Sequence, residues 1–501
     1  MSQTKAQLID NLVQALNFTA TASAPANGVF LSGTNTLAFA TNSGSRVTID
    51  SNGKATFNVD GVFNSINIGK GANSVAGNTV LGESALDDSV SGTLNTAIGK
   101  LSLTTNTSGT QNTGVGAESL EANTTGSANV AVGLRALEAN STGSTNTALG
   151  KDALRANTTA DNNTAVGTDA LTANTTGTQN VAVGASALDA NTTANNNIAI
   201  GHNSMGATTT GSSNTAIGSQ SLRTNTTGTQ NTACGEQALM SATTASNNTA
   251  VGKAALEDNT TGAQNTGLGA FALSENTTAS DNTAVGYQSL KVNTTGSDNT
   301  SLGHNSLVAN TTGTQNVAVG SNALDANTTA NNNIAVGHNS LSANTTGTKN
   351  NALGVGALTS NTTADNNTAI GHEALTANTI GNGHVAVGTS ALQKTTTASN
   401  NVAIGYLSAE ETTTGFANIS IGTQALQENT TAYGNIAIGY QSMMDGNAEN
   451  FNTAVGYQAM KANTSGHSNV AVGGLALDAN TTANYNTAIG YKALTSNTTA
   501  E

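Results

Sequence analysis

The stretch N-T-A-V-G-T-D-A-L-T-A-N-T-T-G-T-Q, residues 163–179, is one copy of a 17-residue phrase that repeats from residue 78 to residue 501. Its glycine recurs at Gly82 and at every seventeenth position to Gly490, which makes 25 copies with no insertion or deletion. Loops of globular proteins vary in length because surface insertions cost little. A period kept this strictly predicts a solenoid, in which one residue more or less would break the stacking of neighbouring copies.

Composition separates this chain from disordered and nucleic-acid-binding proteins. Of its 501 residues 9% are charged and 3% aromatic, and one is a proline. Disordered segments are usually rich in charge and proline and lack strictly spaced apolar residues. We therefore expect an ordered chain. The net charge is −14 and the few Lys and Arg residues do not cluster, so we expect no nucleic-acid partner.

The single cysteine and the apolar runs bear on disulfide formation, export and membrane insertion. Cys234 replaces the valine of the phrase in one copy, and we expect it to be a small buried hydrophobe, without a disulfide framework. The N-terminus lacks the apolar core of a signal peptide, and no run reaches membrane-spanning length. We expect neither signal-peptide export nor membrane insertion.

Three parts follow one another along the chain. Residues 1–17 are an attachment segment, with leucines at every fourth position of a predicted helix over 4–17. Residues 18–77 are a small β region and transition, and residues 78–501 are the solenoid. Apolar and polar residues alternate in four expected strands of the β region, at 28–31, 36–40, 46–50 and 54–59.

Within each copy, positions are counted from the repeat glycine as position 0. Positions −3 and −1 are mostly β-branched or aliphatic, as in Val130 and Val132, and share one face of a predicted strand. Position −2 is small and points to the opposite face. A second apolar pair, Ala-Leu at +3 and +4, forms either a second short strand or a single helical turn. We expect each turn to bury about one Val or Ile, one Leu and some alanines.

The turn after the second pair shows covariation within the chain. Where position +10 is Gly, as at Gly126, position +12 is free, as at Ala128. Where position +10 is Ala, as at Ala160, position +12 is usually Asn or Asp, as at Asn162. Gly and Asn tolerate a left-handed backbone. This pattern predicts two interchangeable turn types, with the left-handed residue at a different place in each.

The thin core predicts self-association. A 17-residue turn with one large aliphatic residue and one leucine buries little apolar surface against the entropy of ordering the backbone. The strand is also apolar on one face and small on the other, as if both were covered, and one thin turn covers only one of them. A homotrimer is the simplest arrangement that covers both.

The phrase N-T-A-[VI]-G-x-x-[AS]-L resembles the head repeats of trimeric autotransporter adhesins, the YadA-like family. The segment 45–53, S-R-V-T-I-D-S-N-G, is similar to segments of phage tail fibres, notably those of cyanophages. The resemblance implies an all-β, left-handed parallel β-roll of about 25 turns in a homotrimeric fibre. It also implies that the N-terminal region attaches the fibre to other virion tail or capsid proteins.

Four histidines follow the repeat glycine at position +1: His202, His304, His338 and His372. The last three lie two turns apart and would form a metal ladder if this position faced a trimer axis. The same position also holds lysines and tyrosines, which favours solvent exposure. We therefore expect no metal site and no cofactor.

Aromatic residues gather beyond residue 400, either just after the glycine or in the turn. Stacked rungs lie about 4.8 Å apart, so aromatics one turn apart would form exposed ladders. Amphipathic aromatics suit binding surfaces, and the alternative is that they only stabilise the stack. The candidate residues for contact with host glycan or a partner protein are Tyr406, Phe416, Tyr433, Tyr440, Phe451, Tyr457, Tyr485 and Tyr491.

Catalytic patterns are missing from the sequence. Carboxylates are scattered over different repeat positions, so we expect no convergent pair for glycoside cleavage and no enzymatic activity. We predict a structural fibre of the virion, about 120 Å long from 25 turns of about 4.8 Å. Two alternatives stay open: an ice-binding or adhesive solenoid presenting threonine columns, and a β-helical polysaccharide depolymerase with acidic residues that meet in a groove.

Overall fold

A computed structural model describes residues 27–33, 36–41, 44–49, 55–57, 61–63, 66–446 and 450–498. The described part is all-β, apart from the short 3₁₀ helix η1 (Ala72–Ser74). From residue 79 onward it is a parallel β-solenoid with one strand every 17 residues. The chain divides into two units, residues 1–194 and 195–501.

The N-terminal strands form an antiparallel sheet of four strands in chain order. They are β1 (Asn27–Gly33), β2 (Thr36–Thr41), β3 (Gly44–Ile49) and β4 (Ala55–Phe57). The four strands predicted from alternating residues are therefore confirmed. The helix predicted over 4–17 lies outside the described residues.

A hairpin covers the first edge of the solenoid in the same unit. Strand β5 (Gly61–Phe63) pairs antiparallel with β6 (Ile66–Gly69), and β6 pairs antiparallel with β7 (Thr79–Gly82). Covering an edge strand in this way removes a row of unpaired backbone groups. The parallel strands that follow β7 in this unit are β8 (Thr96–Ile98), β9 (Thr113–Val115), β10 (Val130–Val132), β11 (Thr147–Leu149), β12 (Thr164–Val166) and β13 (Val181–Val183).

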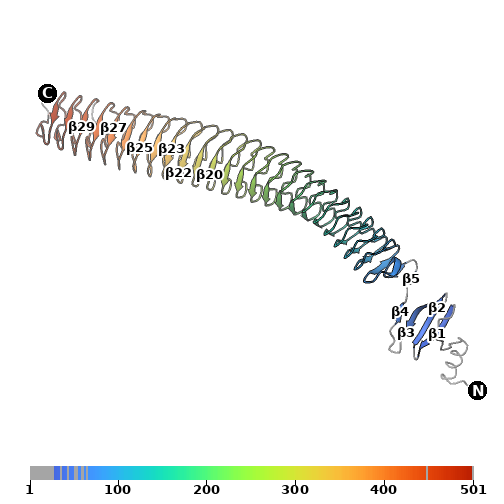
Figure 1. Cartoon of the computed structure of the whole chain (residues 1–501). Helices are drawn as coiled ribbons and strands as arrows, with labels where there is room; N and C mark the ends of the chain where they lie inside the picture. The colour runs from blue at the N-terminus through green and yellow to red at the C-terminus, as the bar shows by residue number, and fades with distance from the viewer. Residues whose placement is uncertain are drawn as a thin grey trace, which may run out of the picture. The chain divides into compact units, whose positions relative to one another are not determined.

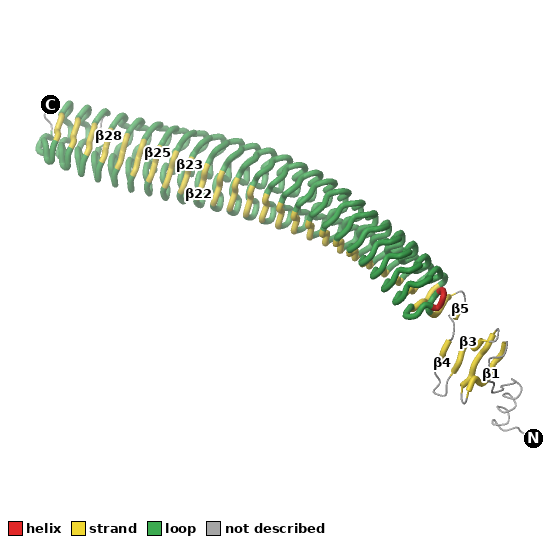
Figure 2. Tube along the Cα trace, in the orientation of Figure 1, coloured by secondary structure: helices red, strands yellow, loops and turns green. Residues whose placement is uncertain are grey.

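The second unit repeats the same rung without a break in register, as the stacked arrows of Figure 1 show. Each turn holds one short strand, drawn yellow in Figure 2, and the rest of the turn is loop. Its strands are β14 (Ile198–Ile200), β15 (Thr215–Ile217), β16 (Thr232–Cys234), β17 (Thr249–Val251), β18 (Thr266–Leu268), β19 (Thr283–Val285), β20 (Thr300–Leu302), β21 (Val317–Val319), β22 (Ile334–Val336), β23 (Asn351–Leu353), β24 (Thr368–Ile370), β25 (Val385–Val387), β26 (Val402–Ile404), β27 (Ile419–Ile421), β28 (Ile436–Ile438), β29 (Thr453–Val455), β30 (Val470–Val472) and β31 (Thr487–Ile489).

The Ala-Leu pair is neither a second strand nor a helical turn. Positions +2 and +4 have a left-handed backbone, for example Asn305 at φ 54° and Leu307 at φ 49°. The repeat glycine before them has no room for a side chain. Gly303 has φ 144°, and a Cβ there would lie 2.5 Å from the carbonyl oxygen of Gly320. The leucine nonetheless points into the core and is fully buried. Burial of this side chain offsets the roughly 1–2 kcal/mol that a left-handed L-residue costs.

The core contains mainly alanine, leucine and asparagine, and the strand valines and isoleucines at positions −3 and −1 lie outside it, whereas Val80 at position −2 of β7 is buried. Ala335 and Leu341 are fully buried, whereas Ile334 and Val336 on the same rung are 39% and 36% exposed. The expectation that each turn buries a Val or Ile was therefore wrong. The leucine at position +4 fills most of the narrow interior, and in β8 to β31 the small residue at position −2 faces inward.

Two columns of buried asparagines hold successive rungs together. At position −4, the backbone N–H of Asn316 donates to Oδ1 of Asn299 at 3.0 Å, and its Nδ2 donates to the carbonyl oxygen of Ala330 at 2.8 Å. At position +7, Nδ2 of Asn327 donates to Oδ1 of Asn310 at 2.9 Å and to the same Ala330 carbonyl at 3.2 Å. Hydrogen bonding of these amides makes their burial tolerable.

The prediction of two turn types was wrong. Position +12 has a left-handed backbone in copies of both kinds, as at Ala128 (φ 57°) and Asn162 (φ 60°). Gly126 at position +10 has no positive φ; its missing side chain leaves room for the carbonyl oxygen of Gly143, which would lie 2.3 Å from an added Cβ. The covariation between positions +10 and +12 therefore has no explanation in the backbone conformation.

Replacing one ladder asparagine tests how far the buried amides stabilise the stack. In Asn310→Leu, Oδ1 of Asn293 loses its donor and Nδ2 of Asn327 loses its acceptor across the rungs. Unsatisfied buried polar groups cost about 1–3 kcal/mol each. We expect the local free energy of opening, measured by hydrogen exchange of residues 293–327, to fall by about 2–4 kcal/mol. Asn310→Thr is the matched control, because Thr208, Thr395 and Thr412 occupy the same position elsewhere. Equal losses in both variants would contradict the role of the amide.

Candidate interaction surfaces

The outward face of the strands, here called the strand face, is uncharged and made of positions −3 and −1. Position −1 is aliphatic in every copy except the one with Cys234, and position −3 is Thr in 14 of the 25 copies and mostly Val or Ile in the rest. No copy carries a charged residue at either position. In the second unit, Ile200, Leu302 and Ile370 are 38%, 47% and 40% exposed on it. Cys234 occupies position −1 of β16 and is half-buried, so the expectation of a buried cysteine was wrong.

The candidate aromatic residues occupy two places in the repeat, one after the strand and one before the next strand. Position +1, two residues after the strand, holds Tyr406, Tyr440, Tyr457 and Tyr491. Positions +11 and +12, just before the next strand, hold Phe416, Tyr433, Phe451 and Tyr485. Seven of these side chains are 44–75% exposed, and Tyr433 is half-buried. All eight are therefore accessible, as expected.

The predicted aromatic ladders form. The rings of Phe416 and Tyr433 stack with centroids 4.7 Å apart and an interplanar angle of 5°. Tyr440 and Tyr457 stack at 5.5 Å and 11°, and Phe451 meets Tyr433 edge-on at 5.2 Å. Stacking covers the ring faces between neighbours, so a partner reaches mainly ring edges, hydroxyl groups and the open face at the end of each stack.

An amide ladder accompanies the tyrosine stack. Nε2 of Gln441 donates to Oε1 of Gln424 at 3.0 Å, and Nε2 of Gln458 donates to Oε1 of Gln441 at 2.7 Å. These residues follow the position-+1 residues directly in sequence. The surface around Tyr440 and Tyr457 therefore combines aromatic rings with polar donors and acceptors, the composition that protein-binding and sugar-binding surfaces use.

The position-+1 histidines are exposed, as the sequence predicted: His202, His304, His338 and His372. His304 stacks on Tyr287 at 5.6 Å with an interplanar angle of 14°. Tyr287 is the one tyrosine before residue 400, and it shares position +1 with Tyr440. Tyr287 lies outside the group of aromatic residues beyond residue 400 and is therefore a suitable control for that group.

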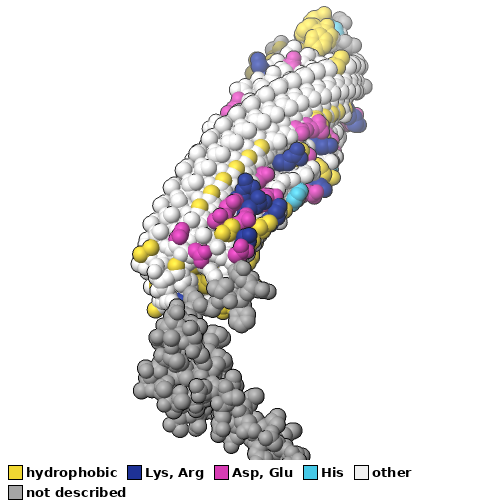
Figure 3. All heavy atoms as spheres, turned by 90° about the vertical axis from the view of Figure 1, so that its right-hand side faces the viewer, with side chains coloured by type: hydrophobic (Ala, Val, Ile, Leu, Met, Phe, Trp, Pro, Cys, Tyr) yellow, Lys and Arg dark blue, Asp and Glu magenta, His cyan; other side chains and the backbone are white. Residues whose placement is uncertain are grey.

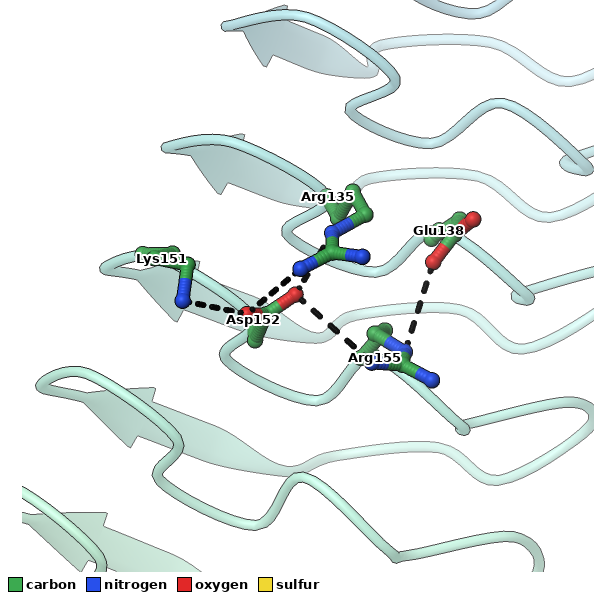
Figure 4. A network of polar contacts seen from close by, with 5 residues as sticks. All are labelled: Arg135, Glu138, Lys151, Asp152 and Arg155. Carbon is green, nitrogen blue, oxygen red and sulfur yellow. Dashed lines mark hydrogen bonds and ion pairs between the residues drawn. The ribbon is translucent and has the colours of Figure 1, made fainter.

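Charged side chains concentrate at positions +1, +2, +5 and +6, and Figure 3 shows them gathered beside rows of uncharged residues. In the first unit they form the network of Figure 4. Asp152, only 3% exposed, lies 2.8 Å from Nε of Arg135, 3.2 Å from Nζ of Lys151 and 4.0 Å from a guanidinium nitrogen of Arg155. Arg155 also pairs with Glu138 at 3.4 Å. The Arg135–Asp152 and Arg155–Glu138 pairs join neighbouring rungs, and the two other pairs lie within one rung.

Three carboxylates meet beside this network. The carboxyl oxygens of Glu118, Glu121 and Glu138 lie within 4.8 Å of one another, so the expectation that carboxylates stay scattered was wrong here. Positions +2 and +5 lie close enough in the folded turn for their side chains to meet. Burial, followed by the negative charges of Glu118 and Glu138, raises the pKa of the Glu121 carboxyl.

A groove of about 470 Å³ lies along the same side chains. It is lined by Glu121, Glu138 and Arg155, together with Thr105 and the position-+6 alanines Ala122, Ala139 and Ala156. Its floor is apolar and its rim carries both signs of charge. Glu121 and Glu138 belong to the acidic trio, so the groove is the place where the depolymerase alternative is open to test.

Exposed threonines form a column at position +9. In the second unit the column is unbroken from Thr210 to Thr363 and is interrupted by Ile380, which is 52% exposed. The neighbouring position-+8 hydroxyls are engaged, since Oγ1 of Thr311 donates to the carbonyl oxygen of Thr328 at 3.0 Å. The ice-binding alternative therefore has one free hydroxyl column in this part of the chain.

His384 was not among the residues singled out from the sequence. It occupies position −4, where all other copies have asparagine, and it is fully buried. The signal was in the sequence, because His384 is the one exception in the column, but no role was assigned to the asparagines of this column. Among the described residues, no helix is long and apolar enough to cross a membrane.

Comparison with models of protein families, with curated proteins and with solved structures found no significant match to this chain.

Proposed function

We propose that this chain is the subunit of a structural fibre, and that copies associate side by side through the strand face. The observation that carries the proposal is the uncharged strand face, with its row of partly exposed aliphatic side chains at position −1 along each unit. Apolar surfaces that continue over many residues are characteristic of protein interfaces. A fibre needs such a surface along its length, and an isolated chain leaves it in water.

A second copy of this chain fits the strand face better than an unrelated partner does. The apolar side chains recur every 17 residues at the spacing of one rung, about 4.8 Å. Another parallel copy presents the same side chains at the same spacing, so contacts on one rung repeat on every rung. A homotrimer, the state implied by the resemblance to trimeric adhesin heads, covers this face on all three chains.

The stack of the second unit suits a spacer. Eighteen strands, β14 to β31, at about 4.8 Å per rung give an axial length of about 80 Å. Within the resemblance to phage tail fibres, the N-terminal region would attach to the virion and the aromatic residues beyond residue 400 would contact a host-surface glycan or another virion protein. Localisation to the virion is part of this proposal.

Charge placed on the strand face tests self-association. Six substitutions to lysine at position −1 of the strand face would place six charges per chain in the proposed interface, and buried unpaired charges are strongly unfavourable. We expect the mass in sedimentation equilibrium to fall from that of three chains to 49.5 kDa, the mass of one chain. The positions are Ile200, Ile217, Val251, Leu302, Val336 and Ile370, all at least 36% exposed in the single chain.

The matched control places six lysines on the exposed threonine column, at Thr210, Thr227, Thr261, Thr312, Thr346 and Thr363. It changes the net charge equally and should leave the assembly intact. A bismaleimide reagent on wild-type Cys234 adds a register test, because in-register copies bring their half-buried thiols to the same rung. A wild-type protein that sediments as a single chain would refute the proposal.

Removing the C-terminal aromatics tests surface contact separately from assembly. In Tyr440→Ala/Phe451→Ala/Tyr457→Ala, the exposed rings are lost from both aromatic columns while the alanine and leucine core is untouched. We expect binding to host cells or to purified surface glycan to drop at least tenfold, with the sedimentation mass unchanged. Tyr287→Ala, which removes a ring from the same position outside the cluster, should bind as wild type does. Unchanged binding by the triple variant would limit the aromatics to stabilising the stack.

A polysaccharide depolymerase is the second candidate, favoured by the acidic trio, of which Glu121 and Glu138 line the groove. Retaining glycosidases hold two carboxyl groups about 5–5.5 Å apart, close to the spacing of Glu121 and Glu138. The raised pKa of Glu121 suits a general acid, which must hold its proton at working pH.

The expected result for this candidate is release of new reducing ends from a bacterial polysaccharide by the wild-type protein. Glu121→Gln should lower the rate by about 10²–10⁴-fold, the usual contribution of a general acid. Glu236→Gln, in a surface ion pair with Lys253 elsewhere, is the control. If the wild-type protein cleaves no polysaccharide in a panel, the depolymerase candidate is rejected and the structural fibre is the only proposed function that stays.

A further inference from the structure

His384 takes over the hydrogen bonds of a ladder asparagine. Its backbone N–H donates to Oδ1 of Asn367 at 2.9 Å, as the asparagines of this column do. Its Nε2 lies 2.7 Å from the carbonyl oxygen of Ala398, where an asparagine Nδ2 would donate. Its Nδ1 lies 3.2 Å from the backbone nitrogen of Asn401, where an asparagine Oδ1 would accept.

These partners select one protonation state of the ring. A carbonyl oxygen only accepts, so Nε2 must carry the proton, and the backbone N–H of Asn401 only donates, so Nδ1 must be bare. The neutral Nε2–H tautomer is the one form of histidine that satisfies both. Protonation would put a second N–H on Nδ1, directly facing the N–H of Asn401.

The second asparagine column is interrupted in the same rungs. Position +7 holds Thr395 and Thr412 in place of asparagine, and Oγ1 of Thr395 donates to the carbonyl oxygen of Thr412. In intact rungs the position-+10 carbonyl accepts from two amides, as Ala330 does. At the Ala398 carbonyl the second amide is replaced by Thr395, whose hydroxyl donates to Thr412 instead. The hydrogen bond to the Ala398 carbonyl therefore comes from Nε2 of His384.

No nearby charge compensates a proton on His384. Its neighbours in the column are the amides Asn367 and Asn401, and its neighbours in sequence are Gly383 and Val385. Burial lowers the pKa of His384, against the two backbone hydrogen bonds, and no charged side chain contributes to the shift.

The charged groups of the adjacent rungs have partners of their own. Oδ1 of Asp365 accepts from Thr348, a carboxyl oxygen of Glu373 accepts from Gln393, and Lys394 pairs with Glu411. Glu410 likewise accepts from Gln427.

We propose that the rungs from His384 to Thr412 are an acid-responsive opening point of the solenoid. At neutral pH the unprotonated ring keeps the ladder continuous. In acid the ring gains a proton, repels the Asn401 N–H and separates its rung from the next, at the place where the other amide ladder is already interrupted. This is a property of the stack itself and goes beyond any fibre role, because it does not depend on what the surface binds.

The sign of the effect follows from proton linkage. The folded pKa lies below the ordinary value of about 6.5, so the opened segment binds a proton that the closed segment does not. Stability is therefore present above pH 6.5 and falls as the pH drops from there toward the folded pKa. In that window the opening equilibrium grows by up to about tenfold per pH unit.

Hydrogen exchange of the full-length protein between pH 7.5 and 4.5 tests the proposal, with rates corrected for intrinsic exchange. We expect protection of residues 385–412 in wild type to fall by up to about tenfold per pH unit below pH 6.5. His384→Asn restores the residue of the column and should abolish this fall. Residues 283–336, with both ladders intact, should show no such change in either protein.

Asn350→His is the matched variant. Asn350 makes the same contacts as His384, to Asn333, Ala364 and Asn367, but its rung keeps Asn361 at position +7. We expect a new acid-sensitive segment at residues 351–378, with weaker opening than at His384. Equal pH dependence of residues 385–412 in wild type and His384→Asn, or an Asn350→His protein without local acid sensitivity, would overturn the proposal.

Discussion

The hydrogen bonds of the position −4 asparagine determine the rest of the fold. Its Oδ1 receives the backbone N–H of the asparagine 17 residues later, and its Nδ2 reaches the position-+10 carbonyl of its own turn, 14 residues later. One side chain thus closes the turn and stacks it on the next. An inserted residue would move the carbonyl or the N–H out of reach and leave buried polar groups unsatisfied. The strict 17-residue period is therefore a hydrogen-bonding requirement as much as a packing one.

A polar ladder in the centre explains why apolar residues lie outside. Two asparagine columns, with alanine and leucine, fill the narrow interior, so the inward position of the strand has room for Ala, Gly or Ser. Valine and isoleucine remain useful on the outward face, where β-branched residues favour the extended backbone. The exposed strand face is thus a direct consequence of the amide core, and covering it requires a second surface of equal length. The self-association that we propose therefore rests on the same hydrogen bonds that set the period.

The period, the strand position and the four N-terminal strands could be predicted from the sequence, because spacing and alternation report them directly. The inside and outside of the strand could not, since both faces lack charge and hydrophobicity alone assigned valine to the core. Asn106 and its equivalents looked like turn residues, because asparagine favours turns and only the structure shows their buried partners. The position-+4 leucines have a left-handed backbone although L-residues prefer a right-handed one. Burial of the leucine side chain overrides this preference. Glu118 and Glu121 looked separate, since their meeting depends on that same turn.

In a stack of near-identical rungs, the copies that depart from the common residues are the ones that differ in chemistry from their neighbours. Rungs with the common residues share one interior, one set of hydrogen bonds and one exposed strand, so no single turn among them can bind or respond differently from its neighbours. Substitutions at surface positions, such as Tyr440 and Tyr457, change what a rung presents but leave the ladder intact. His384 is different in kind, because it replaces a ladder asparagine and keeps its geometry in only one protonation state. A surface exception alters recognition, whereas a ladder exception alters the continuity on which every other rung depends.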